Sequence, residues 1–270
     1  MRTLAITVPV TSIDAKGQAT SRQDTVAVED PLEIRIGRTR IAITMRTPGH
    51  DRELAAGFLF GEGILKSPAQ ITSFNLETRN EVAIKLARGA RPANLENSRR
   101  NFYMTSSCGV CGKASIDAVR AQGCSLLPLD FRIPAATLQA LPDKLRAAQP
   151  TFDRTGGLHA AGLFGPDGEL LSVYEDVGRH NAVDKLIGAE FLAGRVPLDN
   201  RVLVVSGRTS FELVQKAVMA GIPVLAAVGA PSSLAVELSV RVRLTLCGFV
   251  RHDRFNVYST PQRVDLNKCS

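Results

Sequence analysis

The second half of this 270-residue chain alternates apolar runs with amphipathic segments, and this pattern restricts the fold more than any other feature. Three apolar runs, "VLVV", "IPVLAAV" and "LTLCGF", are separated by helix-like stretches over 208–221 and 230–242. A strand that is apolar at every position has to be covered on both faces. The pattern therefore predicts an α/β fold with helices on both sides of the sheet, which is parallel in this region.

The flanking segments extend this prediction to the whole chain. Residues 158–176 are typical of a β-hairpin that turns at "GPDG", and a helix is expected over 178–194. Near the N-terminus the period-two pattern predicts strands over 24–30, 32–37, 40–47 and 80–87, with a helix over 51–65 that ends at Gly61 or Gly63. We therefore expect a smaller α+β domain over 1–125 and an α/β domain over 126–270, in which one helix starts near Pro134.

Charge and composition restrict the class of partner. The net charge of +7 suits an anionic partner, although it also suits solubility alone. The absence of tryptophan and of a Lys/Arg block argues against nucleic acid. Apolar runs are too short to cross a bilayer, and the first residues lack a signal-peptide pattern. We expect a cytoplasmic protein that binds neither nucleic acid nor membrane, in a compartment where thiols stay reduced.

Two of the five cysteines, Cys108 and Cys111, lie in "TSSCGVCGKAS". A structural zinc site needs four ligands, and the second cysteine pair that would complete one is missing, as it is for an iron–sulfur cluster. A thioredoxin-like disulfide normally follows the first strand of a βαβ unit, whereas this pair follows a polar stretch. A metal site built with distant ligands and a redox disulfide both stay open as alternatives, although we do not expect a resident metal.

A nucleophilic or sulfur-carrying thiol is the third reading of the pair. The sequence after Cys111 is helix-like, so backbone N–H groups and Lys113 would lower a thiol pKa there. Gly109 and Gly112 leave room for a bulky partner. A thiolate can accept sulfur as a persulfide, and a neighbouring cysteine can help to release it, so the spacing is compatible with this chemistry.

Two strand-to-helix turns have residues that suit an anion. Arg179 and His180 begin the helix after "YEDVG", and the apolar strand at 202–205 leads into Ser206, Gly207, Arg208 and Thr209. The P-loop pattern is absent, but Ser232 and Ser233 repeat the arrangement after the next strand. Turns at one sheet edge predict a nucleotide crevice, with ordinary helix capping as the alternative for each turn. Glu175 and Asp176 would then bind a sugar or base edge, or form a surface salt bridge.

Two further places have candidate side chains. His159 precedes an apolar strand, where a histidine is either a ligand or a satisfied core residue. Arg251, His252 and Arg254 follow the last core strand, as a basic lip on the crevice or as a solvated loop.

Together these stretches resemble the FdhD family of formate dehydrogenase accessory sulfurtransferases. The matching text is "LAAGFLFGEGIL", "SSCGVCG", "TGGLHAAGLF", "YEDVGRHNAVDKLIG", "SGRTSFELVQKAVMAGIPVLAAVGAPSSLAVELS" and "LTLCGFVR", within residues 25–263. The resemblance implies a homodimer with a cytidine-deaminase-like mixed sheet. The HxE and PCxxC pattern of zinc deaminases is absent, so deamination is not expected.

The resemblance also implies a function. Such proteins take persulfide sulfur from a cysteine desulfurase and pass it to the molybdenum bis-guanine-dinucleotide cofactor that formate dehydrogenase needs. Cys108 would hold the persulfide and Cys111 would assist. The cofactor, or a guanine nucleotide in its place, would bind Phe249, Val250, Arg251, His252, Asp253 and Arg254, beside the turn residues and His159 named above. The alternative is a chaperone that binds the cofactor without sulfur chemistry.

Overall fold

The computed structural model describes residues 3–93 and 126–266. Cys108 and Cys111 lie outside the described residues, as do Cys124 and Cys269. The predicted boundary between residues 125 and 126 falls at the end of that undescribed segment and stays a prediction. Among the described helices, none has the length and apolarity needed to cross a bilayer.

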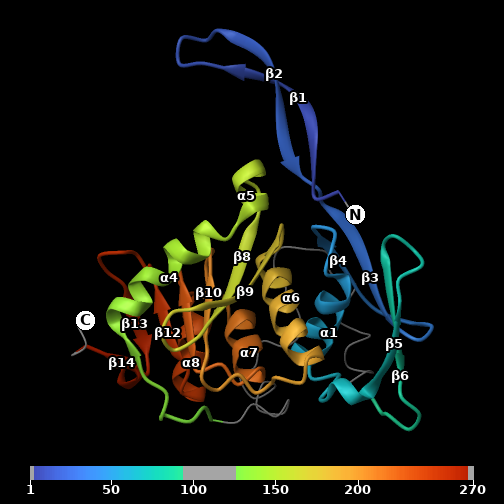
Figure 1. The fold of residues 1–270 in the computed structure, drawn as a ribbon, viewed down its shortest axis with the longest axis vertical. Helices are drawn as coiled ribbons and strands as arrows, with labels where there is room; N and C mark the ends of the chain where they lie inside the picture. Colours follow the sequence, from blue (N-terminus) through green and yellow to red (C-terminus); the bar gives the residue numbers. More distant parts are fainter. Residues whose placement is uncertain (1–2, 94–125, 267–270) are drawn as a thin grey trace.

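A six-stranded mixed sheet forms the larger part of the fold (Figure 1). Its strand order is β13-β12-β11-β10-β8-β9, and β10, β11 and β12 are parallel, whereas β8 pairs antiparallel with β10. The strands are β8 (His159–Phe164), β9 (Leu170–Asp176), β10 (Val202–Val205), β11 (Val224–Ala227), β12 (Thr245–Gly248) and β13 (Asn256–Ser259). The expected mixed sheet with a parallel centre and a hairpin at 158–176 is confirmed.

Helices cover both faces of this sheet, because its central strands have apolar side chains on both faces. Leu203 and Val205 of β10 share a core with α6 (Arg179–Leu192), α7 (Phe211–Met219) and α8 (Ser233–Val242). Val202 and Val204 point the other way and share a second core with α4 (Ala135–Ala147). The period-two alternation of a strand thus explains why every position of β10 is buried.

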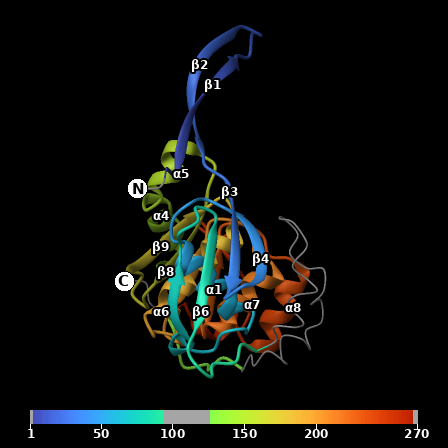
Figure 2. The ribbon, with the colours of Figure 1, turned by 90° about the vertical axis from the view of Figure 1, so that its right-hand side faces the viewer.

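A smaller four-stranded sheet lies beside α1 (Asp51–Gly61), in the order β4-β3-β6-β5 (Figure 2). Its strands are β3 (Asp30–Ile36), β4 (Thr39–Arg46), β5 (Ile71–Asn75) and β6 (Glu81–Leu86). The strands predicted over 32–37, 40–47 and 80–87 are therefore found. Leu32, Leu54 and Val82 belong to the same apolar core as α6 and α7, so the two sheets share one core.

A β-hairpin projects from the body in both ribbon views (Figures 1 and 2). It consists of β1 (Ala5–Ile13) and β2 (Ala19–Ala27), and its base contacts the short helix α5 (Pro150–Thr155). The strand predicted over 24–30 is divided between β2 and β3, because the pairing changes at Val28 and Glu29. The remaining elements are a parallel pair, β7 (Ile133–Pro134) with β14 (Val264–Asp265), and 3-10 turns at Pro68–Gln70 and Pro261–Arg263.

Helices α1 and α6 cross with their backbones in contact. A Cβ atom added to Gly57 would lie 1.9 Å from the carbonyl oxygen of Asp184, and one added to Gly188 would lie 1.8 Å from the carbonyl oxygen of Glu53. Neither space holds even a methyl group. The two glycines therefore set the distance at which the N-terminal sheet packs on the main sheet.

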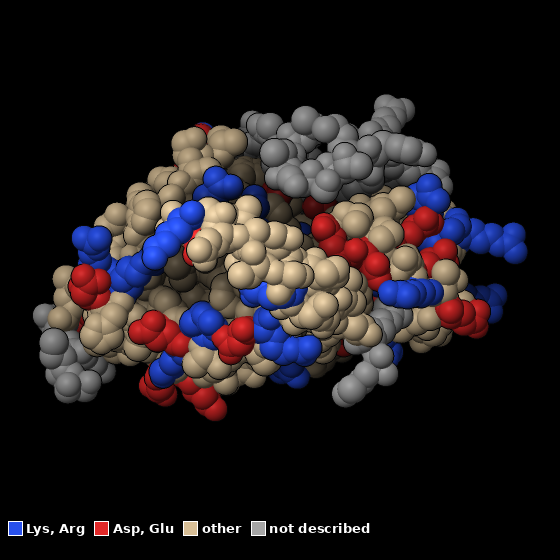
Figure 3. Space-filling view, turned by 90° about the horizontal axis from the view of Figure 1, so that it is seen from above, with Lys and Arg blue, Asp and Glu red and all other residues tan. Residues whose placement is uncertain are grey.

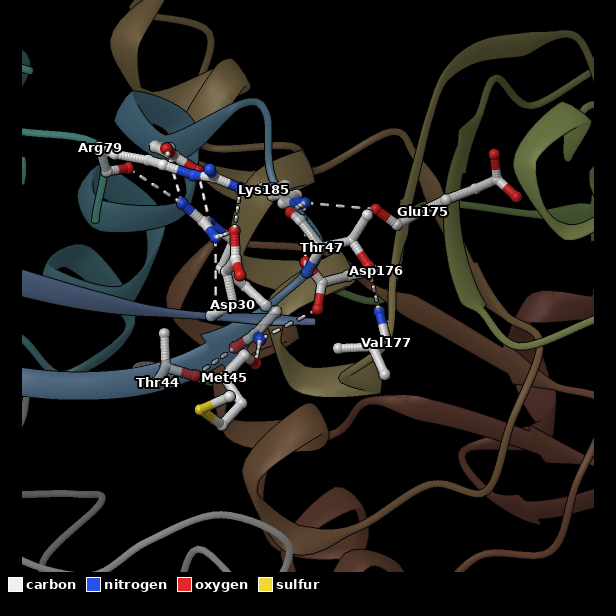
Figure 4. A network of polar contacts seen from close by, with 12 residues as sticks. Asp30, Thr44, Met45, Thr47, Arg79, Glu175, Asp176, Val177 and Lys185 are labelled. Atoms are coloured by element: carbon white, nitrogen blue, oxygen red, sulfur yellow. Dashed lines mark hydrogen bonds and ion pairs between the residues drawn. The ribbon is translucent and has the colours of Figure 1, made fainter. Parts of the chain in front are cut away.

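A buried polar network joins the same two parts (Figure 4). Lys185 Nζ lies 2.7 Å from Asp176 Oδ2 and donates to the carbonyl oxygen of Thr47 at 2.9 Å. The backbone N–H of Thr47 donates to Asp176 Oδ2 at 3.1 Å, and the Thr47 hydroxyl accepts from Val177 N–H. Each charged group thus has several partners, as buried charges require.

Gly57→Ala is expected to lower the free energy of unfolding by about 3 kcal/mol or more, because the methyl group overpacks a backbone contact that cannot yield. Gly165→Ala is the matched control, since a Cβ atom there meets no atom within 4 Å. Chemical denaturation of both variants measures the difference. Equal stabilities for the two variants would contradict the close crossing.

Candidate functional site

The candidate site lies at the edge of the main sheet where β10, β11 and β12 end and β8 begins. The connections that leave these strands are bonded to one another: Gly229 N–H donates to Gly207 O at 3.1 Å, and Phe249 N–H donates to Gly229 O at 3.1 Å. A Cβ atom on Gly229 would lie 2.9 Å from Arg208 N, so this glycine allows the first two connections to touch. The edge is therefore a single bonded surface.

A cavity of about 560 Å³ opens between this edge and the helices α4 and α5. Its lining from the edge includes five of the predicted residues: His159, Ser206, Val250, Arg251 and His252. Seen from above, this side of the molecule has hollowed parts bordered by Lys and Arg side chains (Figure 3). The residues of three separate predicted stretches thus meet at one cavity.

His159 connects the cavity to the basic residues of the edge. A Cβ atom on Gly207 would lie 3.2 Å from its Nδ1 and 3.9 Å from Arg179 Cδ, so both side chains lie over this glycine. Burial lowers the pKa of His159, and the positive charges of Arg179, His180 and Arg208 lower it further against the opposite effect of Asp176. The imidazole is therefore neutral at pH 7, and it can both donate and accept a hydrogen bond.

The start of α6 holds a second part of the site. Arg179 Nε has no hydrogen-bond partner among the described residues. His180 Nε2 lies 3.0 Å from Ser210 Oγ and 2.9 Å from Glu212 Oε2. Ser210 is the N-cap residue of α7, yet its side chain makes no capping bond. The Ser210 hydroxyl bonds to His180 and not to a backbone N–H group of α7.

Ordinary capping explains the other serine turn. Ser232 Oγ accepts from Ala235 N–H at 3.3 Å at the start of α8. Thr209 of the first turn is buried against the second, with its N–H bonded to Ala230 O. The two turns are therefore not equivalent, and the first has the residues that remain available to a ligand.

The stretch 249–254 forms a tight turn at the end of β12. Arg251 N–H donates to Arg254 O at 2.9 Å, and Arg251 Nη1 donates to Val228 O at 2.7 Å. Phe249 has a φ of 53° and is exposed, as are His252, Asp253 and Arg254. Of this stretch, Val250, Arg251 and His252 line the cavity, whereas the other three residues do not.

The carboxylates of Glu175 and Asp176 are bonded within the protein. Glu175 accepts the backbone N–H groups of Thr151 and Phe152 at 2.9 and 2.7 Å, and Asp176 is fully buried beside Lys185. The expectation that these carboxylates bind a sugar or base edge is wrong, and so is the alternative of a surface salt bridge. Both side chains hold the fold together.

The cavity also has a wall that the sequence did not reveal. Leu145, Arg146, Gln149, Phe152 and Leu158 from α4, α5 and the connection to β8 line it. The available signal was the "QPTF" and "TGG" punctuation around a short helix, at 149–152 and 155–157. One helix was expected in this region, and the second, α5, brings these residues to the sheet edge.

Comparisons with known proteins identify the family of this chain. The FdhD/NarQ family model matches residues 27–265. The chain belongs to the FdhD/NarQ family. Proteins named "Sulfur carrier protein FdhD" are 52% identical in Streptomyces coelicolor (93% of this chain, 92% of the relative) and 44% identical in Sulfolobus acidocaldarius (93% and 95%). The resemblance that the motifs indicated is thus confirmed.

A solved structure extends the family match to three dimensions. The crystal structure assigned as a formate dehydrogenase accessory protein from Desulfotalea psychrophila superposes with a TM-score of 0.78 at 27% identity, over 97% of this chain and 100% of that one. The family match includes Cys108 and Cys111 as well as the cavity residues.

Two structural observations narrow the chemistry of the described residues. Cys247 is buried in β12, and burial raises its pKa to about 12, so it is no nucleophile at neutral pH. Within residues 3–93 and 126–266, no group of three or more His, Cys, Asp or Glu side chains could hold a metal ion. Cys247 is therefore not a candidate for a reactive thiol.

Arg179→Met is expected to raise the pKa of His159, because it removes the positive charge that lowers this pKa most. A pH titration of the four histidine Cε1–H signals by NMR measures the shift, with His159→Gln to assign the signal. Arg254→Met is the control, since Arg254 is not among the charges that shift this pKa. A His159 pKa that is unchanged in Arg179→Met would contradict the described cluster.

Proposed function

We propose that this chain is a sulfur carrier that accepts persulfide sulfur from a cysteine desulfurase and passes it to the molybdenum bis-guanine-dinucleotide cofactor, which formate dehydrogenase needs. The observation that carries this proposal is the Cys108–Cys111 pair in a chain whose relatives are named sulfur carrier proteins at 44–52% identity. The cavity with a basic mouth supports an anionic acceptor.

The proposed sulfur steps need only the two cysteines of this chain and one external reductant. The Cys108 thiolate attacks the outer sulfur of the desulfurase persulfide, a new S–S bond forms at Cys108, and the desulfurase cysteine leaves as a thiolate. Cys111 then attacks Cys108 Sγ, so a Cys108–Cys111 disulfide forms and the outer sulfur leaves as hydrosulfide for the acceptor. A dithiol reductant of the cytoplasm restores both thiols.

The cavity and the edge residues would hold the acceptor. A volume of about 560 Å³ lies within the range of roughly 300–1,000 Å³ that is usual for ligand pockets, so the cavity would take one part of so large a cofactor. Arg251 and His252 at the mouth, with Arg179 and Arg208 along the edge, would bind its phosphates. A free guanine nucleotide is the natural surrogate.

The alternative function is a cofactor-binding chaperone without sulfur chemistry. The cavity favours it as much as it favours a carrier, because binding alone would need no cysteine. The two functions differ in what Cys108 does, and we give the carrier preference because of the relatives' names.

Cys108→Ala is expected to abolish sulfur loading. The wild type, incubated with a cysteine desulfurase and cysteine, should gain one sulfur atom in intact mass and lose it on reduction. Cys247→Ala is the matched control and should load like the wild type, because that thiol is buried with a pKa of about 12. Equal loading of the wild type and Cys108→Ala would remove Cys108 as the carrier.

Activation of formate dehydrogenase separates the carrier from the chaperone. If Cys108→Ala binds the cofactor or GDP normally but fails to activate the enzyme, the chaperone is eliminated. Full activation by this variant would instead establish it.

We also propose that the protein acts as a homodimer, as the family resemblance implies. Light scattering of the purified chain should then give twice its 29.0 kDa mass. A mass of 29.0 kDa at all concentrations would contradict the dimer.

A further inference from the structure

The cavity contains one nearly buried amide. Gln149 lines it and is 3% exposed, and among the described residues its side chain has no hydrogen-bond partner. It stands at the N-cap position of α5 but makes no side-chain capping bond there. The amide can therefore pair with a ligand that enters the cavity, and a ligand that lacks the matching donor or acceptor would lose that hydrogen bond.

The surroundings of Gln149 suit a flat ring. The Arg146 guanidinium lies 4.6 Å from the centre of the Phe152 ring and is held by Asp153 at 2.5 Å. Buried Leu145 and Leu158 add apolar surface, and Gly156 and Gly157 add a wall without side chains. Aromatic and guanidinium planes stack on heterocycles, and apolar walls favour their burial.

The polarity of the cavity changes from the inside outward. The buried lining is apolar apart from the Gln149 amide, whereas Arg251 and His252 at the mouth are exposed and polar. A matching ligand has a flat heterocycle with a donor and an acceptor on one edge, and an anionic group at its other end. A nucleotide has this chemistry.

We propose that Gln149 is the base-recognition residue of this site, and that its carboxamide pairs with the Watson–Crick edge of a guanine. The Nε2–H group would donate to guanine O6, and Oε1 would accept from N1–H. The assignment of guanine rests on the proposed function, whereas the pairing rests on the cavity itself. Gln149 is a binding residue in this account and takes no part in sulfur chemistry.

Calorimetry with GDP and N1-methyl-GDP tests the pairing, because the methyl group removes the N1–H donor. The wild type should bind N1-methyl-GDP about 5- to 150-fold more weakly than GDP, which is the range for loss of a bidentate pair. Gln149→Met should weaken GDP binding by a similar factor and no longer distinguish the two ligands. Gln139→Met is the matched control in α4, outside the cavity lining, and should behave like the wild type.

The result that overturns this inference is wild-type affinity for GDP in Gln149→Met, or full discrimination by that variant. The absence of GDP binding by the wild type would overturn it as well. The wild-type comparison of the two nucleotides needs no variant, so poor folding of Gln149→Met would not prevent the test. Sulfur loading of Cys108 in the same preparations is independent: its failure would contradict the carrier function, and weak GDP binding with normal loading would contradict this inference alone.

Discussion

The backbone contact between α1 and α6 is the constraint on which the rest of the structure depends. Gly57 and Gly188 leave no room for a side chain at this crossing, so the two helices have one distance of approach. Because α1 belongs to the N-terminal sheet and α6 covers the main one, the contact sets how the two sheets share their core. The start of α6, with Arg179 and His180, is held in place by the same contact.

Buried ion pairs complete the placement of α6, at a cost in desolvation. Asp184 lies 2.6 Å from Lys216 of α7, and burial raises the pKa of Asp184 to about 6 despite that partner. The Asp176–Lys185 pair joins α6 to the residue that follows β4, because both side chains also bond to the Thr47 backbone. Pairs of this kind add little net stability, but removing one partner leaves an uncompensated charge, so they favour one arrangement of the helices.

The fold of the main sheet can be predicted from the sequence more completely than the functional site can. Runs such as "VLVV" are apolar at every position, and this predicts a strand covered on both faces without knowledge of its neighbours. The β1–β2 hairpin gives no such signal, because most of its residues are exposed. Asp176 was misjudged for a related reason: a carboxylate before a helix suggests a ligand, and its partner Thr47 is distant in sequence.

Contacts between residues distant in sequence also explain why only one side of the cavity could be predicted. His159, Ser206 and Arg251 each follow or precede a recognisable strand, and the ends of neighbouring strands meet at one edge by topology alone. Gln149 and Phe152 reach that edge through the placement of α5, which Glu175 fixes by accepting two of its first N–H groups. The carboxylate that was expected to bind a ligand therefore acts one step away, because it holds the helix that forms the opposite wall.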